Sequence, residues 1–278
     1  MEYYSFIAGL PDLQPDDSKS VITLSALKAD IEESISEADQ KVLNLFFYTF
    51  DNLNLCTQLL GEDAEWNPLG TLSKEEIDDF IAFVKEGKIH QDTHLPPYFA
   101  EFASAYQADT PIFADMSWKD QLTTLYYLDA LNSENEFIKN YFEFNLNLQN
   151  VLSALAARQH GLDVSKVVIG NTEVAESIKS NTSKDFGIAA MFPYLEETLR
   201  IEESRTALEK EQKIDALRWQ WLEDQTVFHY FSKERIFAYM LKLEMVERWL
   251  KMEKATGKAA FAEYVKALVS SVKIDIAQ

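Results

Sequence analysis

The sequence predicts an all-α protein. Of its 278 residues, 47% are apolar and 13% aromatic, and only 8 are glycine and 7 proline, so the chain has ample material for a core and few helix breakers. Apolar residues recur at helical spacing behind Ser/Glu capping signals. Alternation typical of strands is confined to a possible strand in the first ten residues. We therefore expect a globular fold of long helix pairs.

An aromatic-rich stretch runs into a Leu-x-Leu triplet three times. The triplets begin at Leu53, Leu146 and Leu241, which are 93 and 95 residues apart, and the first two copies continue to a glycine and a new helix start at Gly70 and Gly170. A fixed period indicates one repeated supersecondary unit, although any all-helical chain can show such echoes. The repeat predicts three similar helical lobes, residues 1–95, 96–190 and 191–278, in which the three leucines occupy equivalent places.

Start and stop signals predict the helices of the first lobe. Ser36 begins a helix that continues to Gly61, where the glycine supplies a natural stop. Ser73-Lys74-Glu75-Glu76 has the form of a capping box, and the helix behind it ends at Gly87. Residues 88–97 are expected to form a loop, with another helix beginning near Pro97.

The middle of the chain contains the longest predicted helical stretch, residues 117–158. A second capping box beginning at Ser133 can divide it after Asn132, and Gly161 terminates it. A short helix is expected around residues 174–178, followed by a polar loop over 179–184.

The last third is predicted to hold three helices. Pro193 initiates a long charged helix that runs to about Glu223. Ser232 begins another, which Gly257 ends. A final amphipathic helix carries apolar positions at Phe261, Tyr264, Val265 and Leu268.

Charge limits the classes of partner. The chain has 46 acidic and 26 basic side chains, a formal net charge of -20 and a pI of about 4.6. A field of that sign repels phosphate backbones and anionic lipids, which argues against nucleic-acid binding and electrostatic membrane attachment. The acidic surface is interpreted first as a solvated one, and it can also dock onto a basic partner.

The single cysteine and the termini favour a reducing compartment. Cys56 has no internal disulfide partner and is expected to be a small buried residue. The N-terminus has an acid where a signal peptide has basic residues, and no stretch approaches the roughly 20 apolar residues that cross a bilayer. We expect a soluble cytoplasmic protein.

No catalytic, cofactor or metal site is predicted. His90 and His94 are four residues apart, but they lie beside a proline and lack the following glutamate of hydrolytic zinc sites. None of the four histidines has a glutamate three positions before it, and no glycine-rich phosphate loop occurs. His160 precedes a glycine stop, and His229 is expected at the edge of the core. A metal-dependent hydrolase using His90, His94 and nearby acids stays open as an alternative.

Residues 236–248 resemble the last long helix of the C (also called d) subunit of V-type and archaeal-type rotary ATPases. Tyr239, Glu244 and Arg248 match the Tyr, Glu and Arg of that pattern, whereas Val246 stands where a second Glu is common. The N-terminal residues 3–13, with residues 51–55, look closer still to a little-characterised bacterial family associated with V-type ATPase genes.

The resemblance implies fold and function together. The fold is three similar helical lobes in a pseudo-threefold, funnel-like arrangement. The function is that of a non-catalytic central-stalk subunit, which couples the rotating shaft to the membrane ring for ion transport and binds no cofactor. Its partners would be the shaft subunits and the ring, and it would meet the membrane only through that complex. A stand-alone cytosolic helical scaffold or adaptor is the alternative.

Overall fold

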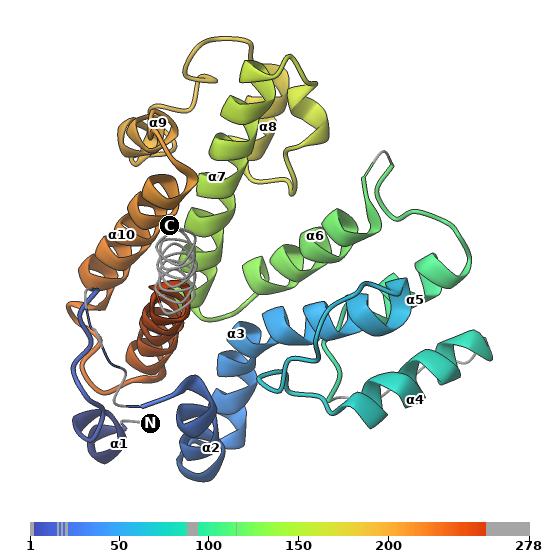
Figure 1. The fold of residues 1–278 in the computed structure, drawn as a ribbon, viewed down its shortest axis with the longest axis vertical. Helices are drawn as coiled ribbons and strands as arrows, with labels where there is room; N and C mark the ends of the chain where they lie inside the picture. Colours follow the sequence, from blue (N-terminus) through green and yellow to red (C-terminus); the bar gives the residue numbers. More distant parts are fainter. Residues whose placement is uncertain are drawn as a thin grey trace, which may run out of the picture.

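A computed structural model of the chain describes residues 3–15, 17, 19, 22–87, 94–114 and 116–253. Its regular elements are all helical, and these ranges contain no strand, which confirms the all-α prediction (Figure 1). The possible strand in the first ten residues is wrong, because residues 4–8 form the short helix α1 (Tyr4–Ala8). Tyr3, just before it, donates from its backbone N–H to the carbonyl of Phe231 at 2.6 Å, which ties this end of the chain to the turn after residue 226.

The first block of helices consists of α2 (Leu24–Ser34), α3 (Glu37–Leu55), α4 (Lys74–Lys85) and α5 (Phe99–Gln107). Ser36 caps α3 by accepting from the Asp39 N–H, and α3 continues as the π-helical turn η1 (Cys56–Leu60) until Gly61 adopts φ 73°. Ser73 and Glu76 form the predicted capping box of α4. These starts and stops are confirmed because each depends on residues within one turn.

The second block consists of α6 (Trp118–Leu131), α7 (Glu136–Gln159), the 3₁₀ turn η2 (Val164–Lys166) and α8 (Glu173–Ser180). The division after Asn132 is confirmed, but the cap is Asn135 and not Ser133, since the Asn135 Oδ1 accepts from the Ile138 N–H at 3.1 Å. Gly161, at φ 66°, follows the end of α7 as predicted.

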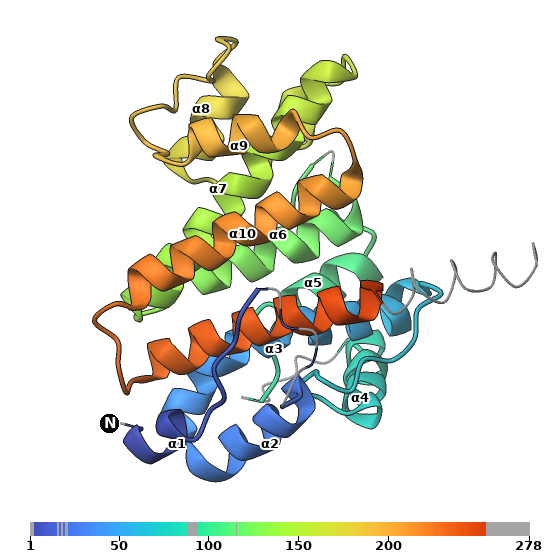
Figure 2. The same ribbon diagram turned by 60° about the vertical axis from the view of Figure 1, so that its left-hand side comes forward.

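The third block consists of α9 (Leu195–Glu202), α10 (Ala207–Thr226) and a helix over residues 233–253. The single helix predicted from residue 193 to about 223 is wrong. Thr206 accepts from the Glu209 N–H and starts a new helix, while an ion pair between Lys210 and Glu202 spans the break. Figure 2 shows α9 and α10 meeting at this bend. Gly257 and the predicted last helix lie outside the described residues.

One hydrophobic core extends through all three blocks, from Tyr3 to Met245. The predicted lobe boundaries, 95/96 and 190/191, fall between α4 and α5 and between α8 and α9. The three lobes remain a prediction, and their helices share this core.

The three leucines of the repeated triplet do not occupy equivalent places. Leu53 is 47% exposed, whereas Leu146 is 0% and Leu241 9% exposed. The triplet register is therefore wrong between the first two copies. Two asparagines that stand 96 positions apart do recur, and each holds the loop that follows its helix.

Two buried asparagines carry this recurrence. The Asn54 amide on α3 donates to the carbonyl of Asn67 at 2.9 Å and accepts from its N–H at 2.8 Å. The Asn150 amide on α7 does the same with Ile169, at 2.8 and 3.0 Å. We call these two asparagines the loop clamps, since each satisfies both backbone groups of one loop residue.

The loops held by the clamps continue alike. Gly70 and Gly170 follow, and each carbonyl accepts from a lysine ammonium, Lys28 of α2 in the first case and Lys179 of α8 in the second. Ser73 and Thr172 then cap the next helices, α4 and α8. The predicted glycine and new helix start after each of the first two copies are thus confirmed.

Candidate functional site

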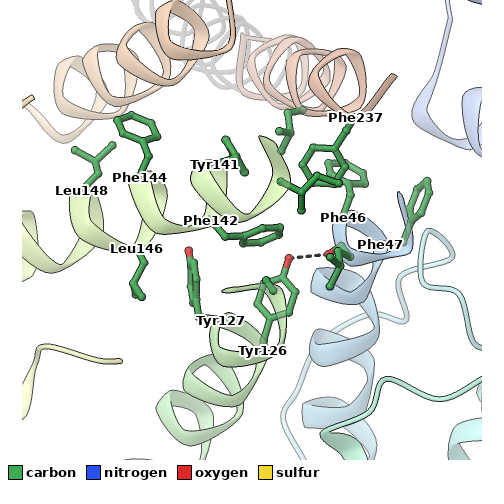
Figure 3. Packing of buried hydrophobic residues seen from close by; sticks show 14 of the residues in the cluster. Phe46, Phe47, Tyr126, Tyr127, Tyr141, Phe142, Phe144, Leu146, Leu148 and Phe237 are labelled. Atoms are coloured by element: carbon green, nitrogen blue, oxygen red, sulfur yellow. Dashed lines mark hydrogen bonds between the residues drawn. The ribbon is translucent and has the colours of Figure 1, made fainter. Parts of the chain in front are cut away.

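Three long helices meet at the centre of the molecule: α3, α7 and the helix over residues 233–253. Each contributes a buried phenylalanine, and Phe237 lies 6.5 Å from Phe46 and 6.2 Å from Phe142 between ring centroids. Figure 3 shows these rings turned toward one another, with Tyr126 and Tyr127 of α6 beside them. Positions 46 and 142 are 96 residues apart, the same spacing as the loop clamps, and position 237 follows 95 residues later.

A cavity of about 450 Å³ opens beside this junction. Its walls carry several aromatic rings, and Leu53 on α3, a large apolar side chain left 47% exposed, also lines it. Its other lining residues include Phe50, Asn52, Cys56, Lys119, Thr123, Tyr141, Asn145, Arg218, Leu241 and Glu244. A pocket of this size and composition accommodates apolar side chains of a bound segment better than it accommodates a phosphate.

Three polar side chains of the cavity are hydrogen-bonded in a row. Arg218 on α10 donates from Nε to the Asn145 Oδ1 at 2.9 Å, and the Asn145 Nδ2 donates to the Tyr127 hydroxyl at 2.7 Å. Burial raises the pKa of Tyr127, so its hydroxyl remains neutral. These two hydrogen bonds connect α10, α7 and α6 and make the cavity wall more rigid.

Cys56 is the one cysteine of the chain and it is buried at the cavity, as predicted. Burial raises the pKa of its thiol to about 11, with the charge of Glu62 adding to the effect. Because the thiolate is the nucleophile, such a cysteine is unreactive at neutral pH. Cys56 therefore contributes a small apolar surface to the cavity wall.

Glu244 and Arg248 lie together, as their spacing on one helix face requires, with 3.7 Å between Glu244 Oε1 and Arg248 Nε. Burial raises the pKa of Glu244 despite the opposing charge of Arg248. Arg248 reaches further to α10, where it pairs with Glu211 and with the buried Asp215. Trp249 also donates to Asp215, at 2.8 Å. These contacts fasten the 233–253 helix to α10.

Tyr239, the third residue of the motif, faces elsewhere. It lines a small recess with residues 10–14, Glu223 and Lys242. Among the described residues its buried hydroxyl has no hydrogen-bond partner. Burial, together with the nearby charges of Asp12 and Asp17, raises its pKa to about 12. The three motif residues therefore do not form one site.

Within the described ranges, no group of three or more His, Cys, Asp or Glu side chains is arranged so that it could hold a metal ion. His90 lies outside those ranges. His160 is the C-terminal cap of α7, and His229 is half-buried with its ring 5.6 Å from Phe137, as expected of a core edge. Over the same ranges, none of the helices combines the length and apolar character needed to span a bilayer.

Comparison with known proteins identifies a family. The model of a family described as a protein of unknown function, DUF2764, matches residues 1–272. The chain belongs to this family. No curated protein and no solved structure matches it.

Sequence reasoning missed the residues of α10 that complete the site. Asp215 is only 5% exposed, although it belongs to a stretch interpreted from the sequence as a charged helix surface. The sequence did offer one indication of its burial. Asp215 directly follows the apolar Ile214 and precedes Arg218 by three residues, and Arg218 pairs with it at 3.3 Å. An acidic residue is rarely buried unless it has such a partner.

Proposed function

We propose that this chain is a non-catalytic central-stalk subunit of a V-type or archaeal-type rotary ATPase, coupling the rotating shaft to the membrane ring during ion transport. In this role it is a cytoplasmic protein that is peripheral to the membrane through the complex. The family resemblance of residues 236–248 and of the N-terminal region suggested the role. The observation that carries it is the junction of α3, α7 and the 233–253 helix around an open, largely apolar cavity.

A coupling subunit has to resist deformation. Buried backbone bonds from the loop clamps, at 2.8–3.0 Å, tie the loops to the long helices α3 and α7. The buried Asp215, shared by Arg218, Arg248 and Trp249, ties α10 to the last described helix. Buried hydrogen bonds and ion pairs of this kind rigidify a fold, and this suits the transmission of torque.

We propose that the cavity is the binding site for the end of the shaft. Leu53 lines the cavity with nearly half of its surface exposed to water, although Asn54 and Leu55, which follow it on the same helix, are fully buried. Exposed large apolar side chains at a concave site are typical of protein-binding surfaces. The mouth also carries Lys119 and Asp120, which are exposed and can orient an incoming segment.

Affinity purification of the tagged chain from its host membranes tests the proposal. We expect rotary ATPase subunits to be recovered in stoichiometric amounts, and recovery of other proteins without them would support the scaffold alternative instead. Deleting the gene should reduce ATP-driven ion transport by a larger factor than it reduces ATP hydrolysis. Unchanged transport in the deletion strain would refute the proposal.

A matched pair of variants locates the contact. Leu53→Asp places a charge at the cavity and should reduce recovery of the ATPase subunits at least tenfold. Leu162→Asp is the control, because Leu162 is 60% exposed on the turn after α7 and does not line the cavity. Equal recovery with both variants would exclude the cavity as the binding site.

A further inference from the structure

An exposed group of apolar side chains occupies the turn between α10 and the 233–253 helix. Val227 is 51%, Phe228 86% and Tyr230 65% exposed, and the ring of Phe231 connects them to Tyr4, which is 62% exposed. The Phe231 ring centroid lies 4.5 Å from that of Tyr4 and 6.4 Å from that of Tyr230. We call these five residues the aromatic corner. It lies near α1 (Figure 2), and none of its five residues lines the central cavity.

The backbone of the corner is held in place. The Phe231 carbonyl accepts from the Tyr3 N–H at 2.6 Å, and the His229 N–H donates to the Thr226 carbonyl at 2.9 Å. Arg235 donates to the Thr226 hydroxyl at 3.0 Å from the following helix. The exposed rings are thus presented on a fixed support, which lowers the entropy lost when a partner covers them.

The exposed aromatic surface is large for a solvated turn. At about 200 Å² per aromatic side chain, the exposed fractions of the three most exposed rings leave on the order of 400 Å² in water. The largest apolar patch on a typical monomer is of about that size and is often functional. Neither the core nor the proposed cavity explains it.

Acidic side chains surround the corner. Glu33 and Glu37 flank the α2–α3 turn, whose Ser34 lines a small recess with Tyr3 and Tyr4. Glu134 and Glu136 flank Asn135, which donates to Glu234 beside the corner. These four glutamates are exposed.

The basic side chains nearest the corner are engaged within the chain. Arg235 donates to the Thr226 hydroxyl and lines a recess that also contains Glu223. The ammonium of Lys233, the lysine next to the corner, is 2.7 Å from the Asp39 carboxylate and is neutralised by it. Lys139 lies one turn into α7 from the acidic turn at residues 134–136.

We propose that the aromatic corner binds a cationic amphipathic segment of a partner protein. Apolar side chains of the segment cover Phe228 and Tyr230, while its lysines and arginines face the surrounding glutamates and can stack on the rings. The same acids disfavour the other occupants, because a second copy of this chain also carries a net charge of -20 and an anionic lipid surface is repelled. The inference stands independently of the proposed rotary role.

Binding of two designed peptides tests the proposal. The probe is a fluorescent 18-residue helical peptide with a leucine face and a lysine face, and its counterpart has every lysine replaced by glutamate. We expect the lysine peptide to bind the full chain, with affinity falling as salt increases. The glutamate peptide should not bind.

Two double variants distinguish the corner from the acidic surface in general. Phe228→Ser with Tyr230→Ser should weaken binding of the lysine peptide about tenfold. Leu208→Ser with Met191→Ser removes exposed apolar side chains elsewhere, 51% and 40% exposed, and should change it less than twofold. All four side chains are exposed, and circular dichroism checks that both variants fold.

Three results would overturn the proposal. The first is equal binding of the lysine peptide to both double variants, which would mean attraction to the acidic surface alone. The second is dimerisation of the full chain that the Phe228 and Tyr230 substitutions abolish, which would make the corner a self-association site. The third is binding to vesicles containing anionic lipid that depends on the same two residues.

Discussion

Substituting Asn150 by alanine tests whether the loop clamps hold the fold together. The change removes two hydrogen bonds, of 2.8 and 3.0 Å, and leaves the N–H and carbonyl of Ile169 without their partner. A buried polar group left unsatisfied costs about 1–3 kcal/mol. Ile169 is half-buried, so water can reach part of its backbone, and we expect a loss of about 2–4 kcal/mol in the free energy of unfolding. That is a large share of the roughly 5–15 kcal/mol typical of a folded protein.

Urea unfolding followed by tryptophan fluorescence measures this loss. Trp221 reports on the right region, since it stacks on Phe144 of α7 at 5.3 Å between centroids. Ser180→Ala is the control, because this exposed hydroxyl only bonds a carbonyl of its own helix, and it should cost less than about 0.5 kcal/mol. If Asn150→Ala costs no more than the control, the clamp does not stabilise the fold.

The corresponding change in the first block, Asn54→Ala, tests the recurrence itself. Asn54 is 1% and Asn150 2% exposed, and each makes the same pair of backbone bonds. The two substitutions should therefore destabilise the protein to within about 1 kcal/mol of each other. A stable Asn54→Ala variant beside an unstable Asn150→Ala variant would contradict the structural equivalence of the two loops.

Three further variants probe other buried contacts of the fold. Gly70→Ala would place a Cβ 2.5 Å from a carboxylate oxygen of α3 and should cost about 1–3 kcal/mol in urea unfolding, whereas Gly9→Ala, with ordinary 3.5 Å contacts, should be tolerated. Although burial acts to raise the pKa of Asp39, hydrogen bonds from a lysine, a tyrosine and a serine hold that pKa below its usual value. The folded state thus keeps this carboxylate ionised where the unfolded chain protonates, so Asp39→Asn should lower stability at neutral pH and flatten its decline below about pH 4 in acid titrations. Arg248→Met removes a partner of a buried carboxylate and should cost about 2 kcal/mol, against less than about 0.5 for the exposed Arg200→Met; equal costs would show that the pairing is unimportant.

Helix class and most helix ends were predictable from the sequence because their causes are local. Ser36, Ser73 and Gly161 act on backbone groups within one turn, so their residue types alone indicate where a helix starts or stops. The same argument placed the division near Asn132, although several polar residues there compete for the cap and Asn135 makes the bond. The break at Thr206 was missed because the charged pattern continues through it.

The candidate site was much less predictable. Glu244 and Arg248 are one turn apart on a helix, so the sequence alone determines that they can pair. Their partner Asp215, the meeting of Phe46 with Phe237, and the hold of Asn150 on Ile169 depend on which helices pack together. The sequence determined the helices and the local pairs, since those follow from neighbours in the chain. Tertiary structure alone decided which leucine is buried and where the cavity and the aromatic corner lie, because burial is set by contacts between residues distant in sequence.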